Sequence, residues 1–434
     1  MNSTAMAGIC LAAFALSIFL SYRRKLNTGI LAMAFAYLIG CFVMNLSVSD
    51  VVALFPVKIL FLLFSVCFFY GYAIENGTLQ IIASHIIYRF RNKTKFLPFV
   101  LYVLAFFMAV LGASAPAVSS FLAPVCMVIG AGTGIHYLIM LVLICLGSGA
   151  GSLVPWGQGG LIIRGIVEQS SFASEAVSLP AKICLNLFFT GLIALILVYF
   201  IFKGYRAAPC EIKKPEKLNT VQKKTLAVLA VVLALVLVPT MFNTLHPAES
   251  IRRFSQLFDI QMLSIVGAVV CALMGLGDEK KILLKSVPWN TIVLVCGVCM
   301  LLGITEYTGI FDSITGVLNT NLPQTAIGCI LVLLGGFMSF FSGAMSVVIP
   351  LFLPMVLTIS AGGGHSPVAL ASALSIGAVM TCTSPFSTAG SFVLSCLPDA
   401  KMRDQIFGKQ FALTCLLFAV PVLLMAAGAY NLLG

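Results

Sequence analysis

Ser152-Leu-Val-Pro-Trp-Gly-Gln-Gly-Gly160 and Thr381-Cys-Thr-Ser-Pro-Phe-Ser-Thr-Ala-Gly390 are the two stretches of sequence that decide the fold. Each lies inside a long apolar segment and joins a proline, which cannot donate a backbone hydrogen bond, to glycines or hydroxyl residues that loosen a helix. A proline alone would favour a simple kink. Because both stretches add glycine or a run of Ser and Thr at the same place, we predict that two helices are interrupted there.

The composition around these stretches is typical of a membrane protein. Hydrophobic residues make up 60% of the 434 residues and charged residues only 9%, whereas soluble domains carry roughly 25% charged residues. This excludes an ordinary soluble enzyme, a nucleic-acid-binding protein and a disordered chain. The apolar stretches are continuous rather than alternating, which indicates membrane helices and not a barrel. Backbone groups cannot stay unpaired in lipid, so the interruptions must face protein or a watery cavity.

The apolar segments predict about ten transmembrane helices, since a helix needs roughly 20 residues to cross the hydrocarbon core. They lie near 5–21, 28–45, 54–74, 135–150, 180–203, 225–242, 258–276, 289–307, 366–380 and 409–431. Two further apolar stretches, 97–132 and 325–360, are too long for one span, and each has a small polar centre. We predict that both are re-entrant hairpins, which enter and leave the membrane on one side.

The basic residues predict the orientation of the chain. Net charge is +11, with 25 Lys and Arg against 14 Asp and Glu. When the ten spans alternate from an outside start, most of these basic residues fall in the cytoplasmic segments, as in other inner-membrane proteins. We therefore expect a multi-pass protein of the cell membrane (inner or plasma membrane) with both termini outside. The 14 cysteines are scattered along apolar runs, and we expect no metal site or cofactor.

The two halves of the sequence resemble each other. The segments 121–124 and 351–354 both end in Pro, and 154–160 matches 384–390 at the same offset of 230 residues. Pro56 and Pro288 are followed at equal distance by Gly77 and Gly309. An all-α fold of two inverted-topology repeats follows, because the second unit starts on the opposite side of the membrane. Inverted repeats with interrupted helices are typical of secondary transporters.

The predicted division of the chain has three parts. The first repeat covers 1–205, with the hairpin 97–132 and the broken helix 135–168. A basic cytoplasmic linker covers 206–224. The second repeat covers 225–434, with the hairpin 325–360 and the broken helix 366–398.

A broken helix creates a new N-terminus whose free N–H groups and positive partial charge favour an anion. Unwound carbonyls and nearby hydroxyls supply the oxygen ligands that a hard cation prefers. The candidate substrate-binding residues are Ser114, Ser119, Ser120, Gln158, Arg164, Ser342, Ser346, Ser387 and Thr388. The candidate cation-binding residues are Ser152, Pro155, Thr383 and Ser384.

Each of these candidates has a plainer structural explanation. Serine also serves close packing of membrane helices. Arg164 could extend to the outer interface beside Glu168 instead of pairing with a substrate carboxylate. We read Glu75, Glu306 and Asp312 as helix-end charges rather than proton carriers. An intramembrane hydrolase built on Ser342 and His365 is a third, weaker hypothesis, since the two residues must meet within hydrogen-bond reach.

The hairpin followed by a proline-containing break, present twice, resembles the ion transporter superfamily. Within it, the chain is similar to the divalent-anion/sodium symporters and the MatC-type dicarboxylate carriers. Thr383-Ser384-Pro385 resembles the second turn of that family and Val154-Pro155 the first, whereas the tips Ser114-Ala-Pro116 and Ala344-Met-Ser346 lack the family's asparagine. The resemblance implies an elevator mechanism in which 97–203 and 325–431 move against a scaffold that forms a homodimer.

We therefore predict a secondary active transporter, not an enzyme. Its substrate would be a small organic anion, a dicarboxylate such as malonate, succinate or malate, and its driving ion Na⁺ or H⁺. Its partners would be this anion and the lipid bilayer, with no nucleic acid and with Na⁺ as coupling ion in place of a cofactor. The alternative is a Na⁺/H⁺ or oxyanion antiporter of the same superfamily, which would need a carboxylate embedded in the membrane.

Overall fold

The computed structural model describes residues 3–24, 26–90, 92–208, 214–245, 257–308, 323–340, 343–397 and 400–432. All regular structure in these ranges is helical, which agrees with the predicted all-α class. The helices of the first half are α1 (Ser3–Arg24), α2 (Thr28–Tyr37), α3 (Val48–Ala53), α4 (Val57–Glu75), α5 (Thr78–Arg89), α6 (Leu97–Val110), α7 (Ala115–Thr133), α8 (Tyr137–Ser152), α9 (Gln158–Val167) and α10 (Ser178–Ile201).

The second half contains α11 (Thr220–Leu245), α13 (Ile260–Leu273), α14 (Glu279–Lys285), α15 (Trp289–Glu306), α17 (Gln324–Ser339), α18 (Ile349–Gly363), α19 (Pro367–Met380), α20 (Thr388–Ser395), α21 (Ala400–Leu417) and α22 (Ala419–Ala426). A π-helical turn, η1 (Leu38–Val43), extends α2. Another, η5 (Ala344–Val348), precedes α18, and a 3₁₀ turn, η6 (Thr381–Thr383), follows α19.

Several of these helices are long and apolar enough to cross a membrane. Within the described residues, five reach this length: 48–75, 115–133, 178–201, 344–363 and 401–426. Nine shorter apolar helices accompany them. The chain is thus a helical membrane protein, while the number of crossings stays a prediction.

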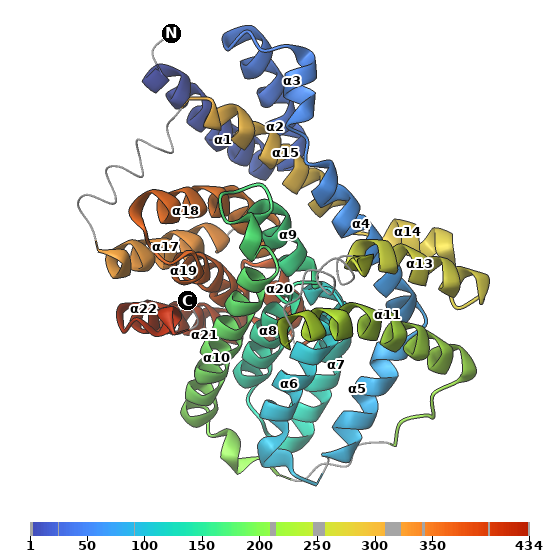
Figure 1. The fold of residues 1–434 in the computed structure, drawn as a ribbon. Helices are drawn as coiled ribbons and strands as arrows, with labels where there is room; N and C mark the ends of the chain where they lie inside the picture. Colours follow the sequence, from blue (N-terminus) through green and yellow to red (C-terminus); the bar gives the residue numbers. More distant parts are fainter. Residues whose placement is uncertain are drawn as a thin grey trace.

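The helices form two groups that are visible in Figure 1. Helices α1, α2, α3 and α15 stand together at the top, and α4 runs from this group down to α13 and α14. Helices α6 to α10 and α17 to α22 form the larger body. Helix α2 packs on α15 at the top, and α4 packs on α13 below it. Each of these contacts joins a helix of the first half of the chain to a helix of the second half.

The centre of the larger body consists of α8 and α19. Every residue of α8 is buried, and in α19 every residue from Val368 to Met380 is buried. A helix that is apolar on all faces fits either the lipid or the protein interior, and the burial of α8 and α19 places them in the interior. Helix α6 packs against α8, α17 packs against α19, and α10 contacts both central helices. The amide Nδ2 of Asn186 on α10 donates to Ser372 Oγ on α19 at 2.9 Å, which fixes this contact with a buried hydrogen bond.

Candidate functional site

The first interruption separates α8 from α9. Helix α8 ends at Ser152, and α9 begins at Gln158. Pro155 lies between them, buried and without an N–H group, and it disfavours a helical conformation for the residue before it. Gly157 then adopts an extended conformation, with φ −78° and ψ 159°, and starts the new helix.

The second interruption has the same form. Helix α19 ends in the turn η6, Pro385 follows Ser384, and α20 begins at Thr388. Ser387 is extended, with φ −76° and ψ 154°, and its hydroxyl accepts a hydrogen bond from the Gly390 N–H at 3.1 Å. The chain is therefore interrupted between α8 and α9 and between α19 and α20, at Pro155 and Pro385, as the sequence predicts.

One close approach of the backbone is common to both interruptions. A methyl group on Gly160 would overlap the carbonyl oxygen of Val154 and lie 2.7 Å from that of Leu153. A methyl group on Gly390 would overlap the carbonyl oxygen of Ser384 and lie 2.9 Å from that of Thr383. The unwound segment therefore folds back over the first turn of the new helix in each case. Only glycine leaves room for this.

Helix–turn–helix units stand beside the interruptions. Helices α6 and α7 are joined by a turn at 111–114, and α17 is followed by η5 and α18. Helix α20 packs on α7, whereas α9 packs on α18, so each new helix contacts the unit from the other half of the chain. A methyl group on Gly159 would lie 2.8 Å from Sδ of Met345 in η5. Trp156 Nε1 donates to the Val110 carbonyl at 2.8 Å, which holds the first interruption against the end of α6.

The predicted serines of these tips have different environments. Ser114 caps α7 by accepting from the Ala117 N–H at 3.3 Å, and Ser120 is exposed with its hydroxyl on the Pro116 carbonyl. Ser119 is buried, and its Oγ has no hydrogen-bond partner among the described residues. Ser346 is half-buried in η5. Ser342 lies outside the described residues.

The hydroxyls of the interruptions bond to nearby carbonyl groups. Ser152 Oγ donates to the Gly149 carbonyl at 2.8 Å, Thr383 Oγ1 to that of Met380 at 2.9 Å, and Ser387 Oγ to those of Cys382 and Ser384 at 2.6 and 2.8 Å. A hydroxyl has one proton and two lone pairs, so donation leaves it able to accept or to coordinate a cation. Ser384 Oγ accepts from the Phe386 N–H at 3.2 Å.

The two new N-termini differ in one respect. Ser387 caps α20, but Gly157 supplies no side chain to cap α9. The first N–H groups of α9 therefore keep their hydrogen-bonding capacity and the positive end of the helix dipole. Gln158, at the first position of α9, is half-buried, and its side chain makes no hydrogen bond with any described residue. The backbone of Thr388 begins α20.

Arg164 is engaged with carboxylates of the protein itself. Its Nε lies 2.8 Å from Glu168 Oε1, and one terminal nitrogen lies 3.4 Å from Asp259 Oδ2. The side chain is 15% exposed. Two carboxylates already balance this guanidinium, so the structure favours the structural explanation for Arg164 over a substrate contact. The ion pair also links α9 to the first turn of α13, where Asp259 is the N-cap.

Gln410 belongs to the second interruption but is missing from the predicted site. Its Nε2 donates to the carbonyls of Thr383 and Gly390, at 2.8 and 3.2 Å, and Tyr137 OH donates to its Oε1 at 3.3 Å. The side chain is fully buried. A glutamine within the apolar run 409–431 was the available signal, because a polar residue within a membrane is usually functional or paired.

Charged residues are kept out of the interior of the described protein. No Asp, Glu, Lys or Arg is among the buried side chains of these ranges. Glu75, at the end of α4, pairs with Lys281 of α14 at 2.7 Å, as expected for a helix-end charge. Asp312 lies outside the described residues, as does Gly309 of the predicted repeat, and the side chain of Glu306 is not described. No group of three His, Cys, Asp or Glu side chains suited to a metal occurs in the same ranges.

The chain is similar to known carrier and transport proteins in part of its sequence and in its fold. The model of the N-terminus of the dicarboxylate carrier protein MatC matches residues 4–152, which end at the first interruption. No curated protein sequence matches the chain. The YdaH transporter of Alcanivorax borkumensis, described as having an unusual topology, is 15% identical, with a TM-score of 0.61 and 98% of each chain covered.

A second solved structure has the same fold. MtrF of Neisseria gonorrhoeae, described as illuminating a class of antimetabolite efflux pumps, is 14% identical, with a TM-score of 0.61 over 90% of this chain and 83% of its own. The matched family is a carrier family and both neighbours in fold are transport proteins, which confirms the predicted resemblance. Residues 4–152 are therefore similar to the N-terminus of the MatC dicarboxylate carrier, and the chain shares its fold with two transport proteins.

Proposed function

We propose that this transporter carries a small dicarboxylate of the malonate, succinate or malate type, driven by a gradient of Na⁺ or H⁺. The uncapped N-terminus of α9 is the observation that carries the proposal. Its free N–H groups and helix dipole attract a carboxylate without a cationic side chain. The match to a dicarboxylate carrier over residues 4–152 supports the same substrate class.

Two carboxylate groups suit two helix N-termini. Gln158 and the backbone of α9 would hold one carboxylate, and the start of α20, with Ser387 and Thr388, would hold the other. Ser119 supports this arrangement because its buried hydroxyl has no partner within the described residues and lies on α7, which packs on α20. Ser114, Ser346 and Ser342 remain proposed contacts at the tips, and Arg164 is left out.

The coupling cation would bind among the unwound backbone groups. Thr383 and Ser384 at the second interruption, with Ser152 and Pro155 at the first, offer carbonyl and hydroxyl oxygens. Sodium is favoured over a proton because the described interior holds no buried carboxylate that could carry a proton. The same observation weighs against the Na⁺/H⁺ antiporter alternative.

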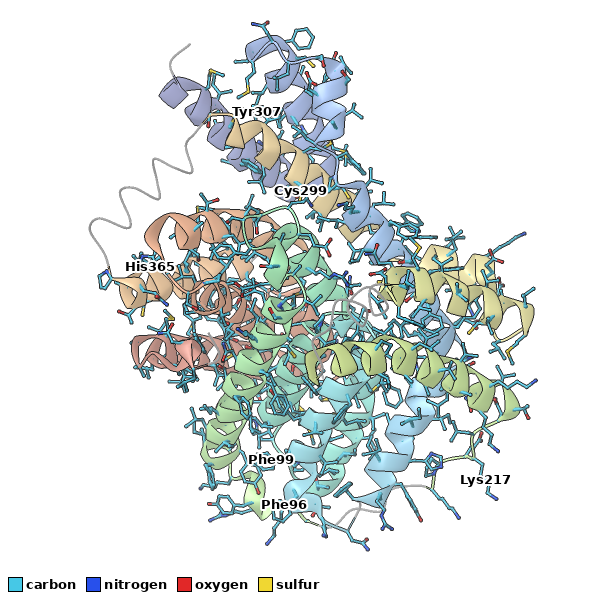
Figure 2. All side chains as sticks on the ribbon, viewed as in Figure 1. Phe96, Phe99, Lys217, Cys299, Tyr307 and His365 are labelled. Atoms are coloured by element: carbon cyan, nitrogen blue, oxygen red, sulfur yellow. The ribbon has the colours of Figure 1, made fainter. Side chains whose placement is uncertain are left out.

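An elevator movement would carry the site across the membrane. A cavity of about 420 Å³ lies between the two groups of helices, lined on one side by Leu54 and Cys299 and on the other by Ile166 and Leu357. In Figure 2, the label of Cys299 shows where α15 borders this cavity. An incompletely packed boundary favours sliding of the two groups past each other, since tight packing resists such movement. We further propose a homodimer built on the upper helices, with both chain termini outside.

Uptake by the purified protein in liposomes tests the proposal. Radiolabelled malonate, succinate and malate should accumulate when an inward Na⁺ gradient is imposed, and less when K⁺ replaces Na⁺. An imposed pH gradient without Na⁺ separates proton coupling from sodium coupling. Absence of uptake for every di- and monocarboxylate under both gradients would refute it.

A further inference from the structure

A groove with a basic end lies outside the candidate site, along α6. It has a volume of about 930 Å³ and runs between α5 and the start of α6, with Ala207 beyond α10 closing one side. Most of its lining is apolar, including Phe90, Phe99, Val103 and Phe107. Lys93 and Lys95 line the end next to the loop between α5 and α6.

The basic end has a fixed backbone. Tyr199 OH donates to the Lys95 carbonyl at 3.1 Å, and the rings of Tyr199 and Phe99 pack with centroids 5.0 Å apart. The Lys93 N–H donates to the Phe90 carbonyl at 2.9 Å. These contacts hold the two lysines at the mouth of the groove instead of leaving them on a free loop.

No carboxylate in the described part of the chain balances the positive charge at this end. Neither Lys93 nor Lys95 has a carboxylate partner among the described residues, where the ion pairs are those of Arg164 and Lys281. The sequence contains no Asp or Glu between Glu75 and Glu168. An anion from outside the chain is therefore the natural partner of these lysines.

The apolar part of the groove opens to the surface. Phe96 is 64% exposed, Phe107 is 52% exposed and Val103 is 37% exposed. Figure 2 shows Phe96 and Phe99 together at the lower end of the body, one turn apart. In a membrane protein such a surface faces acyl chains, and a long hydrocarbon chain fills a groove of this shape where a small dicarboxylate cannot.

We propose that this groove binds an anionic phospholipid. One acyl chain lies along α6 against Phe99, Val103 and Phe107, and the phosphate pairs with the ammonium groups of Lys93 and Lys95. The basic loops predict that this end is cytoplasmic, and the cytoplasmic leaflet carries the anionic lipids. A zwitterionic lipid fits the same groove but has no net charge to balance the lysines.

Native mass spectrometry of the delipidated, full-length protein tests the assignment. Titration with phosphatidylglycerol and phosphatidylcholine should give tighter binding of the first phosphatidylglycerol molecule. The double variant K93Q/K95Q should bind it roughly 25-fold more weakly, because each of the two basic residues near an anionic surface contributes about fivefold. Its binding of phosphatidylcholine should stay within about twofold.

Two control variants separate the groove from general attraction. K223Q/K224Q removes the same charge from exposed positions on α11 and should leave both affinities unchanged. Val103→Trp fills the groove and should weaken both lipids. Equal binding of the two lipids by the wild type would overturn the proposal. Equal losses of phosphatidylglycerol affinity in K93Q/K95Q and in K223Q/K224Q would also overturn it.

A photoreactive group in the acyl chain of phosphatidylglycerol provides a measurement on the unaltered protein. Labelled peptides should come from α5 and α6, and unlabelled phosphatidylglycerol should suppress the labelling at a lower excess than phosphatidylcholine does. Labelling confined to other helices would contradict the assigned groove whatever the variants do.

Discussion

Gly160 and Gly390 are the residues on which the two interruptions depend. At each, a carbonyl group of the unwound segment occupies the space that a side chain would need. The two contacts involve matched residues at an offset of 230, with Val154 and Leu153 in the first case and Ser384 and Thr383 in the second. Proline explains why each helix stops, whereas glycine explains how the next one can start so close to it.

We expect Gly160→Ala and Gly390→Ala to lower both stability and transport. Forcing a methyl group into a filled site costs about 1–3 kcal/mol, and the shift would move the N-terminus of α9 or α20. Thermal melting of the purified variants and uptake in liposomes measure the two effects. Gly408→Ala is the matched control, because nothing lies within 4 Å of its added methyl group. If Gly160→Ala and Gly390→Ala both transported as well as Gly408→Ala, the interruptions would not depend on these two glycines.

Gln410 holds the second interruption through two carbonyl groups. Gln410→Leu keeps the approximate shape but leaves the Thr383 and Gly390 carbonyls without a buried donor, which costs about 1–3 kcal/mol. We expect a lower melting temperature and weaker transport. In the control Gln324→Leu, the side chain loses an exposed hydrogen bond to Asn431 and a long one, 3.4 Å, from the Ser366 N–H, so the loss should be smaller than at Gln410, within about 1 kcal/mol. Equal melting temperatures of the two variants would exclude the proposed role of Gln410.

At the scale of elements, the two interrupted helices have the same layout but different caps. Ser387 caps α20 with its hydroxyl, and Gly157 leaves α9 uncapped. Each new helix packs on the helix–turn–helix unit of the other half, α9 on α18 and α20 on α7. The two N-termini are thereby held by rigid neighbours, which suits a binding site that must keep its geometry.

Replacing helix caps distinguishes a binding role from a structural one. Both Ser387→Ala and Ser366→Ala remove an N-cap, at α20 and at α19, and each should cost about 1 kcal/mol of stability. Only Ser387→Ala should also raise the KM for the dicarboxylate, by roughly tenfold, because in the bound state the hydroxyl would turn its proton from the Cys382 and Ser384 carbonyls to the substrate carboxylate. Parallel changes of KM in both variants would show that Ser387 acts through stability alone.

The sequence was sufficient to predict the interrupted helices and not the contacts between them. Pro155 and Pro385, with their glycines, predict breaks because those residues act locally on the backbone. The partners of Gln410 and of Arg164 depend on which helices meet in space, and a single sequence does not contain that information. Asp259 is far from Arg164 along the chain, so the ion pair between α9 and α13 could not be foreseen. The π-helical turn at 344–348 has no comparable sequence signal.

At the scale of the whole molecule, two groups of helices meet across an incompletely filled boundary. The upper group contains α1, α2, α3 and α15, and the larger body contains the interrupted helices (Figure 1). Contacts between the two halves of the chain hold α2 against α15 in the upper group, and α4, which runs down from this group, against α13. This division supports the proposed elevator movement, in which the body carries the substrate past the upper group.

Filling the boundary cavity should block movement without removing the binding site. Thr358 of α18 lines this cavity and is half-buried. We expect Thr358→Trp to reduce uptake at least tenfold and to leave the dicarboxylate Kd within about twofold. Thr358→Val, which keeps the size of the side chain, should transport normally. Normal uptake by the tryptophan variant would contradict sliding at this boundary.

Ligand-induced stabilisation tests the central claim most directly, because a ligand that binds only the folded protein raises its apparent stability. The measurement is the melting temperature of the purified transporter with malonate, succinate or malate, in Na⁺ and in K⁺, for the wild type and for Thr383→Val. We predict that at least one dicarboxylate raises the melting temperature of the wild type in Na⁺, and that both K⁺ and Thr383→Val weaken this effect. No stabilisation by any dicarboxylate in either salt would contradict an anion site at the interrupted helices.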